Sequence, residues 1–169
     1  MQAFVERLAA VEIGGTYNQY AAAPHLCERL LRYLGERRDA PVLLVGEAAG
    51  YRGARVSGLP FTSERQLTGS GPAEATATIV HRVLAHLGLE HAVLLWNVVP
   101  THPGTADTNR PPTRDEVAAG LPFARELAHG RRVLAVGRIA ERALAAPYVR
   151  HPSHGGAAAF RDTLAAWMT

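Results

Sequence analysis

The chain has no lysine and a single cysteine among its 169 residues. One thiol, Cys27, can form neither an internal disulfide nor the four-cysteine ligand set of an iron–sulfur cluster, so both are excluded within one chain. We expect Cys27 to pack as a small apolar side chain on a helix face. Without lysine, only the N-terminal amine remains to form a Schiff base. The sequence therefore argues against catalysis by a side-chain amine.

Long apolar runs are also missing. No stretch approaches the roughly 20 uninterrupted apolar residues of a membrane-spanning helix, and residues 1–10 lack the basic, apolar and cleavage zones of a signal peptide. We therefore predict a cytoplasmic protein without membrane contact. With 47% hydrophobic residues, the length suits one domain over residues 1–169 with a core of its own.

Metal-binding patterns are absent from the sequence. The eight histidines include no His-x-x-x-His or His-Glu-x-x-His arrangement, the spacings that place two imidazoles on one face of a helix. We therefore predict neither a metal nor a cofactor. The histidines without a partner at such a spacing are expected on the surface or packed between helices, namely His81, His86, His91, His102 and His129.

The charge balance leaves the function open. All 18 basic residues are arginine, and 15 acidic residues leave a net charge of +3 and a pI near 9.5. Such a mild positive excess permits nucleic-acid binding without requiring it, since many proteins that never touch DNA have the same balance.

Four short apolar runs bounded by turn residues predict buried strands, at residues 41–46, 92–97, 132–137 and 147–151. Between them, helical periodicity predicts helices at residues 24–37, 72–87, 113–129, 138–144 and 157–167. The helix at 113 is the best marked, because Thr113 and Glu116 have the spacing of a capping box. This alternation predicts a single α/β domain with a central, mostly parallel four-stranded sheet flanked by helices.

Glycines and polar residues gather where three of the predicted strands end. The first strand runs into Gly46-Glu47-Ala48-Ala49-Gly50, a loop whose backbone amides can surround a ligand. The second ends at Asn97, whose amide offers both a donor and an acceptor to the edge of a base. The last ends at His151. Because ligands bind beyond the carboxyl ends of parallel strands, we expect these residues to face one crevice.

Each of these residues alone has an ordinary structural explanation. Glu47 would be a solvated turn carboxylate, and Asn97 a residue that ties down its own loop. Phe61 would be a packing aromatic, and His151 a histidine hydrogen-bonded to backbone. Their joint occurrence, in order and at the ends of separate predicted strands, favours a common site.

Together the motifs resemble those of the uracil-DNA glycosylase superfamily. The resemblance extends over about residues 40–168. The motif sequences are most similar to those of the iron–sulfur branch first known from thermophiles. This chain lacks the cysteines of that cluster and has Ala49 where that branch usually places proline. The matching segments are Gly-Glu-Ala-x-Gly at 46–50, Gly-x-Pro-Phe at 58–61, Asn-Val-Val-Pro at 97–100, Asn-Arg-Pro-Pro-Thr at 109–113, Val-Leu-Ala-Val-Gly-Arg-Ile-Ala at 133–140 and His-Pro-Ser at 151–153.

The resemblance implies a three-layer α/β/α fold and a monofunctional DNA glycosylase. Such an enzyme would hydrolyse the N-glycosidic bond of uracil or a related deaminated base in DNA and so initiate base excision repair. Its partner would be DNA, its product free uracil, and its working state a monomer. Because strand cleavage by a glycosylase normally needs an amine, the missing lysines predict no lyase activity.

The resemblance also implies a role for each motif. Glu47 would orient or deprotonate the attacking water, and His151 would donate a hydrogen bond to uracil O2. Phe61 would stack on the flipped base, while Asn97 would bind its pairing edge and reject cytosine. The remaining substrate contacts would be Gly46 and Ala48 through the amides of their loop, Tyr51 as a wall against the thymine methyl, and Ser153 at a DNA phosphate.

Two alternatives stay open. A module of the same fold that binds damaged DNA with little or no turnover is compatible with the altered loop at Ala49 and with the lack of a bulky wedge residue at 154–158. A nucleotide-binding doubly wound domain is disfavoured, because neither the Walker spacing nor Gly-x-Gly-x-x-Gly occurs.

Overall fold

A computed structural model describes residues 1–168. Within them, four parallel strands form one sheet in the order β2-β1-β3-β4. The strands are β1 (Val42–Ala48), β2 (Val93–Val99), β3 (Arg132–Val136) and β4 (Tyr148–Val149). The prediction of a parallel four-stranded sheet is confirmed, although β4 is only two residues long and ends before His151.

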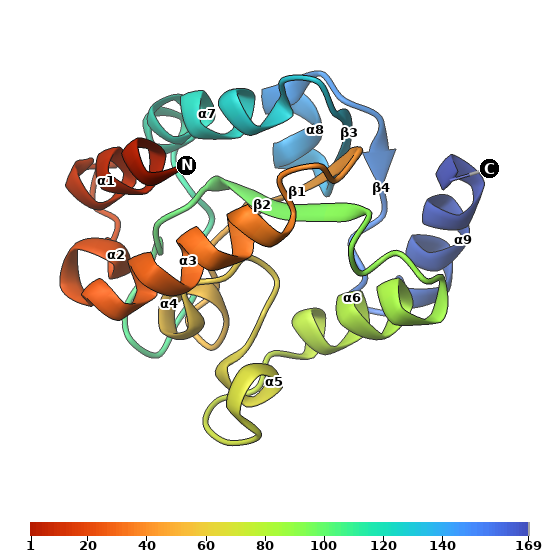
Figure 1. Ribbon diagram of the computed structural model, residues 1–169, viewed down its shortest axis with the longest axis horizontal. Coiled ribbons are helices and arrows are strands. Elements are labelled where there is room, and N and C mark those ends of the chain that lie inside the picture. Colours follow the sequence, from red (N-terminus) through yellow and green to blue (C-terminus); the bar gives the residue numbers. More distant parts are fainter. Residues whose placement is uncertain (169) are drawn as a thin grey trace.

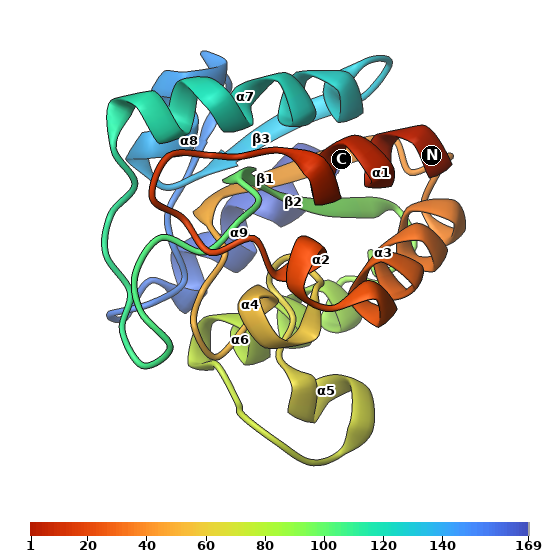
Figure 2. The same ribbon diagram turned by 90° about the vertical axis from the view of Figure 1, so that its left-hand side faces the viewer.

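Helices cover both faces of this sheet. α7 and α8 lie on one side, and α3, α4 and α6 lie on the other (Figure 1, Figure 2). The helices are α1 (Gln2–Ala10), α2 (Gln19–Ala22), α3 (Pro24–Glu36), α4 (Ala54–Ser57), α5 (Glu64–Thr68), α6 (Ala75–His86), α7 (Arg114–Ala128), α8 (Arg138–Leu144) and α9 (Ala157–Met168). Among the described residues, no helix is long and apolar enough to cross a membrane.

The core lies between the sheet and these helices. Every residue of β2 and the first five of β1 are buried, as continuous apolar runs of a doubly covered parallel sheet require. Trp96 is completely buried and packs edge-on against Phe4 of α1 with ring centroids 5.5 Å apart. Cys27 of α3 packs against the same core, as expected.

The strand register brings the motif-bearing loops together. Gly46 of β1 lies opposite Asn97 of β2, and Ala48 lies opposite Val99. The strands are parallel, so their carboxyl ends meet at one edge of the sheet, where His151 follows β4. The fold therefore presents Glu47, Asn97 and His151 from three strands to one side of the molecule.

Candidate active site

Gly46 allows an aromatic ring and an amide to meet at the end of β1. A Cβ at this position would overlap the ring of Phe61 and lie 3.0 Å from Asn97 Oδ1. Only glycine lets Phe61 and Asn97 approach the strand so closely. Phe61 is buried and has a left-handed backbone with φ of 51°, a conformation that costs a bulky residue on the order of 1–3 kcal/mol. The surrounding loop must hold it there.

Hydrogen bonds in that loop supply the restraint. The Ser57 hydroxyl lies 2.6 Å from the carbonyl oxygen of Thr62, to which it donates. The Thr62 hydroxyl lies 3.0 Å from the Pro60 carbonyl oxygen and from His81 Nε2. Phe61 is thus held between anchored neighbours.

The side chain of Asn97 has no hydrogen-bond partner in the protein. The residue is 4% exposed, and its side chain makes no hydrogen bond to any other residue in the described part of the chain. Asn97 lines a small cavity beside Phe61. Because an amide offers both a donor and an acceptor, this side chain can bind a polar group that enters the cavity.

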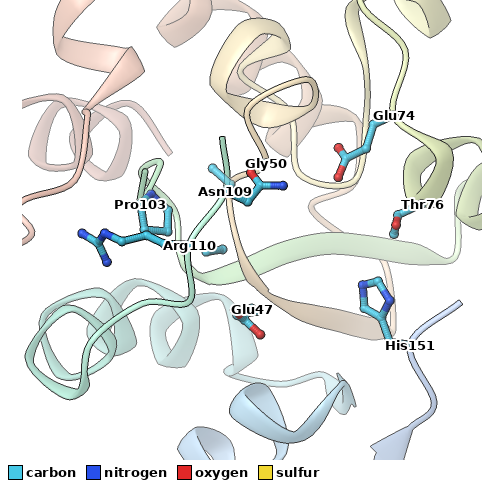
Figure 3. A pocket seen from close by; sticks show the side chains of 10 residues that line it. Glu47, Gly50, Glu74, Thr76, Pro103, Asn109, Arg110 and His151 are labelled. Carbon is cyan, nitrogen blue, oxygen red and sulfur yellow. The ribbon is translucent and has the colours of Figure 1, made fainter. Parts of the chain in front are cut away.

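The cavity has an inner and an outer part. The inner part, about 60 Å³, is lined by Phe61, Asn97 and Ala54, and the outer part, about 220 Å³, opens toward Pro103, Asn109 and Arg110. The residues that line both parts are Glu47, Ala48, Gly50, Glu74, Thr76 and His151. Figure 3 shows Glu47, Glu74, Thr76 and His151 placed around this shared region.

The hydrogen bonds of His151 fix its tautomer. The backbone N–H of Ser153 donates to His151 Nδ1 at 3.3 Å, and the Ser153 hydroxyl lies 2.7 Å from the same nitrogen. Because a backbone N–H can only donate, Nδ1 is an acceptor and the proton of the neutral ring is on Nε2. Burial, and to a lesser extent the nearby His154, lowers the pKa of His151. The ring is therefore a neutral N–H donor facing the cavity.

Two carboxylates face the same region. Burial raises the pKa of Glu47 and the pKa of Glu74, and neither carboxylate has a hydrogen bond or ion pair to another described residue. Glu74, at the N-cap of α6, was missed in the sequence because it falls within the predicted start of that helix. No motif in the residues around Glu74 indicates a functional role. Only the fold brings this residue to the cavity.

An ion pair forms the outer wall. Both terminal guanidinium nitrogens of Arg110 donate to the carboxylate of the buried Glu116, at 2.8 and 2.6 Å. Hydrogen bonds from Arg110 and from the Thr113 backbone hold the pKa of Glu116 at about 2 despite its burial. Asn109 Oδ1 accepts a hydrogen bond from the Tyr51 N–H at 2.9 Å. Asn109 and Arg110 thus tie the two cavity loops together.

The other residues predicted to contact the substrate do not all line the cavity. Ala48 lines the cavity, and Gly46 lies beneath it between Phe61 and Asn97. Tyr51 is not among the lining residues, and its ring stacks with Arg52, whose guanidinium carbon is 5.2 Å from the ring centroid. Ser153 contacts His151, so its structural role is to orient the imidazole.

The prediction that His102 lies on the surface or between helices is wrong. The side chain is completely buried, and its ring nitrogens lie 2.7 Å from the carbonyl oxygens of Ala49 and Thr105. It anchors the loop after β1 to the loop after β2. The ring takes this position because the buried carbonyl group of Ala49 needs a hydrogen-bond donor, which an imidazole N–H can supply.

No group of three or more His, Cys, Asp or Glu side chains within residues 1–168 is arranged to hold a metal ion. The cavity instead offers an aromatic face, an unpartnered amide, a neutral imidazole and two carboxylates. This set suits an uncharged planar ligand attached to a group that becomes positively charged.

Comparison with known proteins identifies the family. Residues 33–167 match the family model described as the uracil DNA glycosylase superfamily. The crystal structure of Pedobacter heparinus SMUG2 shares the fold, with a TM-score of 0.72 over 98% of this chain and 96% of that chain, at 13% sequence identity. A search among curated proteins finds no significant match. Because the family model covers most of the sequence, the chain belongs to the uracil DNA glycosylase superfamily.

Proposed function

We propose that this protein is a monofunctional DNA glycosylase that hydrolyses the N-glycosidic bond of uracil, or of a related deaminated base, in DNA. The observation that carries the proposal is the unpartnered amide side chain of Asn97 beside Phe61, in a cavity that Glu47 and His151 also line. Family membership supports the same class of activity. The protein would act as a monomer on DNA, and free base would be its product.

The inner part of the cavity suits a flipped base. The ring of Phe61 offers a stacking surface worth about 1–3 kcal/mol per base. The Asn97 amide presents an oxygen that accepts from N3–H of uracil and an N–H₂ that donates to O4. Cytosine has the reverse pattern, because its N4 amine donates and its N3 accepts, so an amide in this orientation would reject it.

The residues at the junction of the two parts suit hydrolysis. Breaking the bond leaves positive charge on the sugar and negative charge on the base. The Nε2–H of His151 would donate a hydrogen bond to uracil O2 as that charge develops. Glu47, when ionised, would accept the proton of the attacking water.

A direct test uses labelled oligonucleotides that carry uracil in a single strand, opposite guanine and opposite adenine, followed by alkaline cleavage of abasic sites. We expect cleavage only where uracil stood and only after alkali, because the chain has no lysine for strand scission. Borohydride should trap no protein–DNA adduct. Hypoxanthine and xanthine substrates, assayed in parallel, define the range of bases.

The alternative is a module that binds damaged DNA without turnover. It predicts affinity for uracil-containing DNA or abasic DNA with no release of any of the three bases. That outcome would overturn the proposed enzyme and leave the fold and the cavity to serve binding alone.

A further inference from the structure

The cavity carries negative charge that no cation of the described chain balances. Glu47 and Glu74 both line it, and neither has an ion-pair partner among the described residues. Arg110 is the one arginine in its described lining, and both of its terminal guanidinium nitrogens are bound to Glu116. His151 is held neutral by burial. The site is therefore suited to a ligand with positive charge and unsuited to a phosphate.

The fold holds the Glu74 carboxylate at the cavity by close contact with backbone. A Cβ at Gly53 would overlap the carboxylate, and one at Gly50 would lie 2.8 Å from its nearer oxygen. These two glycines let the loop after β1 close over Glu74. The carboxylate is thereby partly removed from water without receiving a hydrogen bond from another described residue.

Glu74 lines the region where the inner and outer parts of the cavity meet. The inner part is closed by Phe61 and Asn97, whereas Glu74, Glu47 and His151 line both parts. If the base occupies the inner part, as the proposed function requires, the glycosidic bond lies at this junction. An ionised carboxylate there is favourable beside a cationic sugar and unfavourable beside an anionic base.

We propose that Glu74 is a second catalytic carboxylate, whose charge stabilises the cation that forms on the deoxyribose of the excised nucleotide. This inference rests on the proposed function. As the C1′–N bond breaks, its electron pair leaves with the base, and the sugar becomes an oxocarbenium ion between the two carboxylates. Water then bonds to C1′ and loses a proton to Glu47, which passes it to solvent. The base anion, held by His151, takes up a proton from solvent.

Abasic-site analogues test this role without turnover. One DNA duplex carries a pyrrolidine in place of the target nucleotide, which is a cationic mimic of the sugar, and a matched duplex carries the neutral tetrahydrofuran. We expect the protein to bind the pyrrolidine duplex more tightly. Glu74→Gln should reduce that preference at least about 10-fold while leaving tetrahydrofuran binding unchanged, and it should slow single-turnover base release by about 100-fold. Glu90→Gln, which alters an exposed carboxylate outside the cavity, should change neither.

The outcomes separate the inference from the function on which it rests. If the unaltered protein releases uracil but Glu74→Gln keeps the pyrrolidine preference, Glu74 does not act on the sugar. If Glu74→Gln weakens binding to the pyrrolidine and tetrahydrofuran duplexes equally, the role of Glu74 is structural. A melting curve then shows whether the variant is folded. If the unaltered protein releases no base and prefers neither duplex, the proposed function itself fails.

Discussion

At the level of single residues, the site depends on polar side chains that have no protein partner. Asn97 makes no side-chain hydrogen bond, and the partly buried Glu47 and Glu74 have neither a hydrogen bond nor an ion pair among the described residues. These groups are available to a ligand in the cavity. Their substitution is informative, because each change alters one hydrogen-bond pattern or one charge.

Asn97→Asp should change which base is recognised. An aspartate accepts at both oxygens, so it loses the donor to uracil O4 and gains an acceptor for the cytosine amine. One matched pair of hydrogen bonds to a base is worth about 1–3 kcal/mol. We expect uracil release to fall by about 5- to 150-fold and release of cytosine to appear, measured in single-turnover assays. Unchanged selectivity between uracil and cytosine would contradict the role of Asn97.

The rate should fall on the acid side of neutrality. Glu47 must be ionised to accept a proton, and burial raises its pKa, so the active form is lost as the pH falls through that raised value. Burial lowers the pKa of His151, and protonation of that ring leaves its Nε2–H donor in place, so we assign the acid limb to Glu47. A pH profile of single-turnover rates checks this, and Glu47→Gln should abolish its acid limb together with most of the activity. An acid limb that persists in Glu47→Gln would assign it to another group.

At the scale of elements, the start of α7 fastens two loops around the cavity. Thr113 and Glu116 form the predicted capping box, and the same Glu116 carboxylate binds Arg110. A Cβ at Gly14 would come within 2.7 Å of Glu116 Cγ, so the segment after α1 also packs closely against it. One buried carboxylate thus joins the segment after α1 to Arg110 and the start of α7.

Glu116→Gln should therefore lower stability in a pH-dependent way. The folded-state pKa of Glu116 is about 2, below its ordinary value of 4.5, so its contribution is present above 4.5 and is lost as the pH falls toward 2. Thermal melting should show a lower Tm for the variant at neutral pH and no difference from the unaltered protein near pH 2. The neighbouring exposed Asp115→Asn is the control, and it should melt like the unaltered protein. Equal effects of both variants would contradict the role given to the buried pair.

The sequence predicted the long elements better than the short ones. Strands at 42–48, 93–99 and 132–136 follow from their apolar runs, and α3, α6, α7, α8 and α9 from their periodicity and end signals. The helices α1, α2, α4 and α5 were not predicted. α2, α4 and α5 span five residues or fewer, and α1 begins without a side-chain cap. Tertiary packing, such as Phe4 against Trp96, stabilises α1 instead.

In the molecule as a whole, the parallel strands place motifs from separate parts of the sequence at one site. The structure brings Glu47, Phe61, Asn97 and His151 to one cavity, as the order of motifs along the chain leads one to expect. Glu74 could not be predicted, because it reaches the cavity only through the packing of α6 against the loop at 50–53. The buried position of His102 likewise arises from contacts between two loops, which no local pattern encodes.

Stability and function should oppose each other in this molecule. A raised carboxylate pKa means that the folded state holds a proton more tightly than the unfolded state, so ionisation at higher pH costs stability. Glu47→Gln and Glu74→Gln should each raise the Tm at neutral pH by a few degrees, and the gain should disappear in acid, where the native carboxyls are protonated. Differential scanning calorimetry across pH tests this, and a lowered Tm at neutral pH would show that the carboxylates stabilise the fold instead.

In the proposed reaction, the neutral imidazole of His151 and the cavity around it release a deaminated base from DNA. Single-turnover release of uracil should be compared for the unaltered protein, His151→Ala, Ser153→Ala and the control His129→Ala, which alters an exposed histidine outside the cavity. We predict that His151→Ala loses about 100- to 1000-fold in rate, that Ser153→Ala loses less because the backbone N–H still fixes the tautomer, and that His129→Ala stays near the unaltered rate. Equal rates for the unaltered protein and His151→Ala would contradict the account.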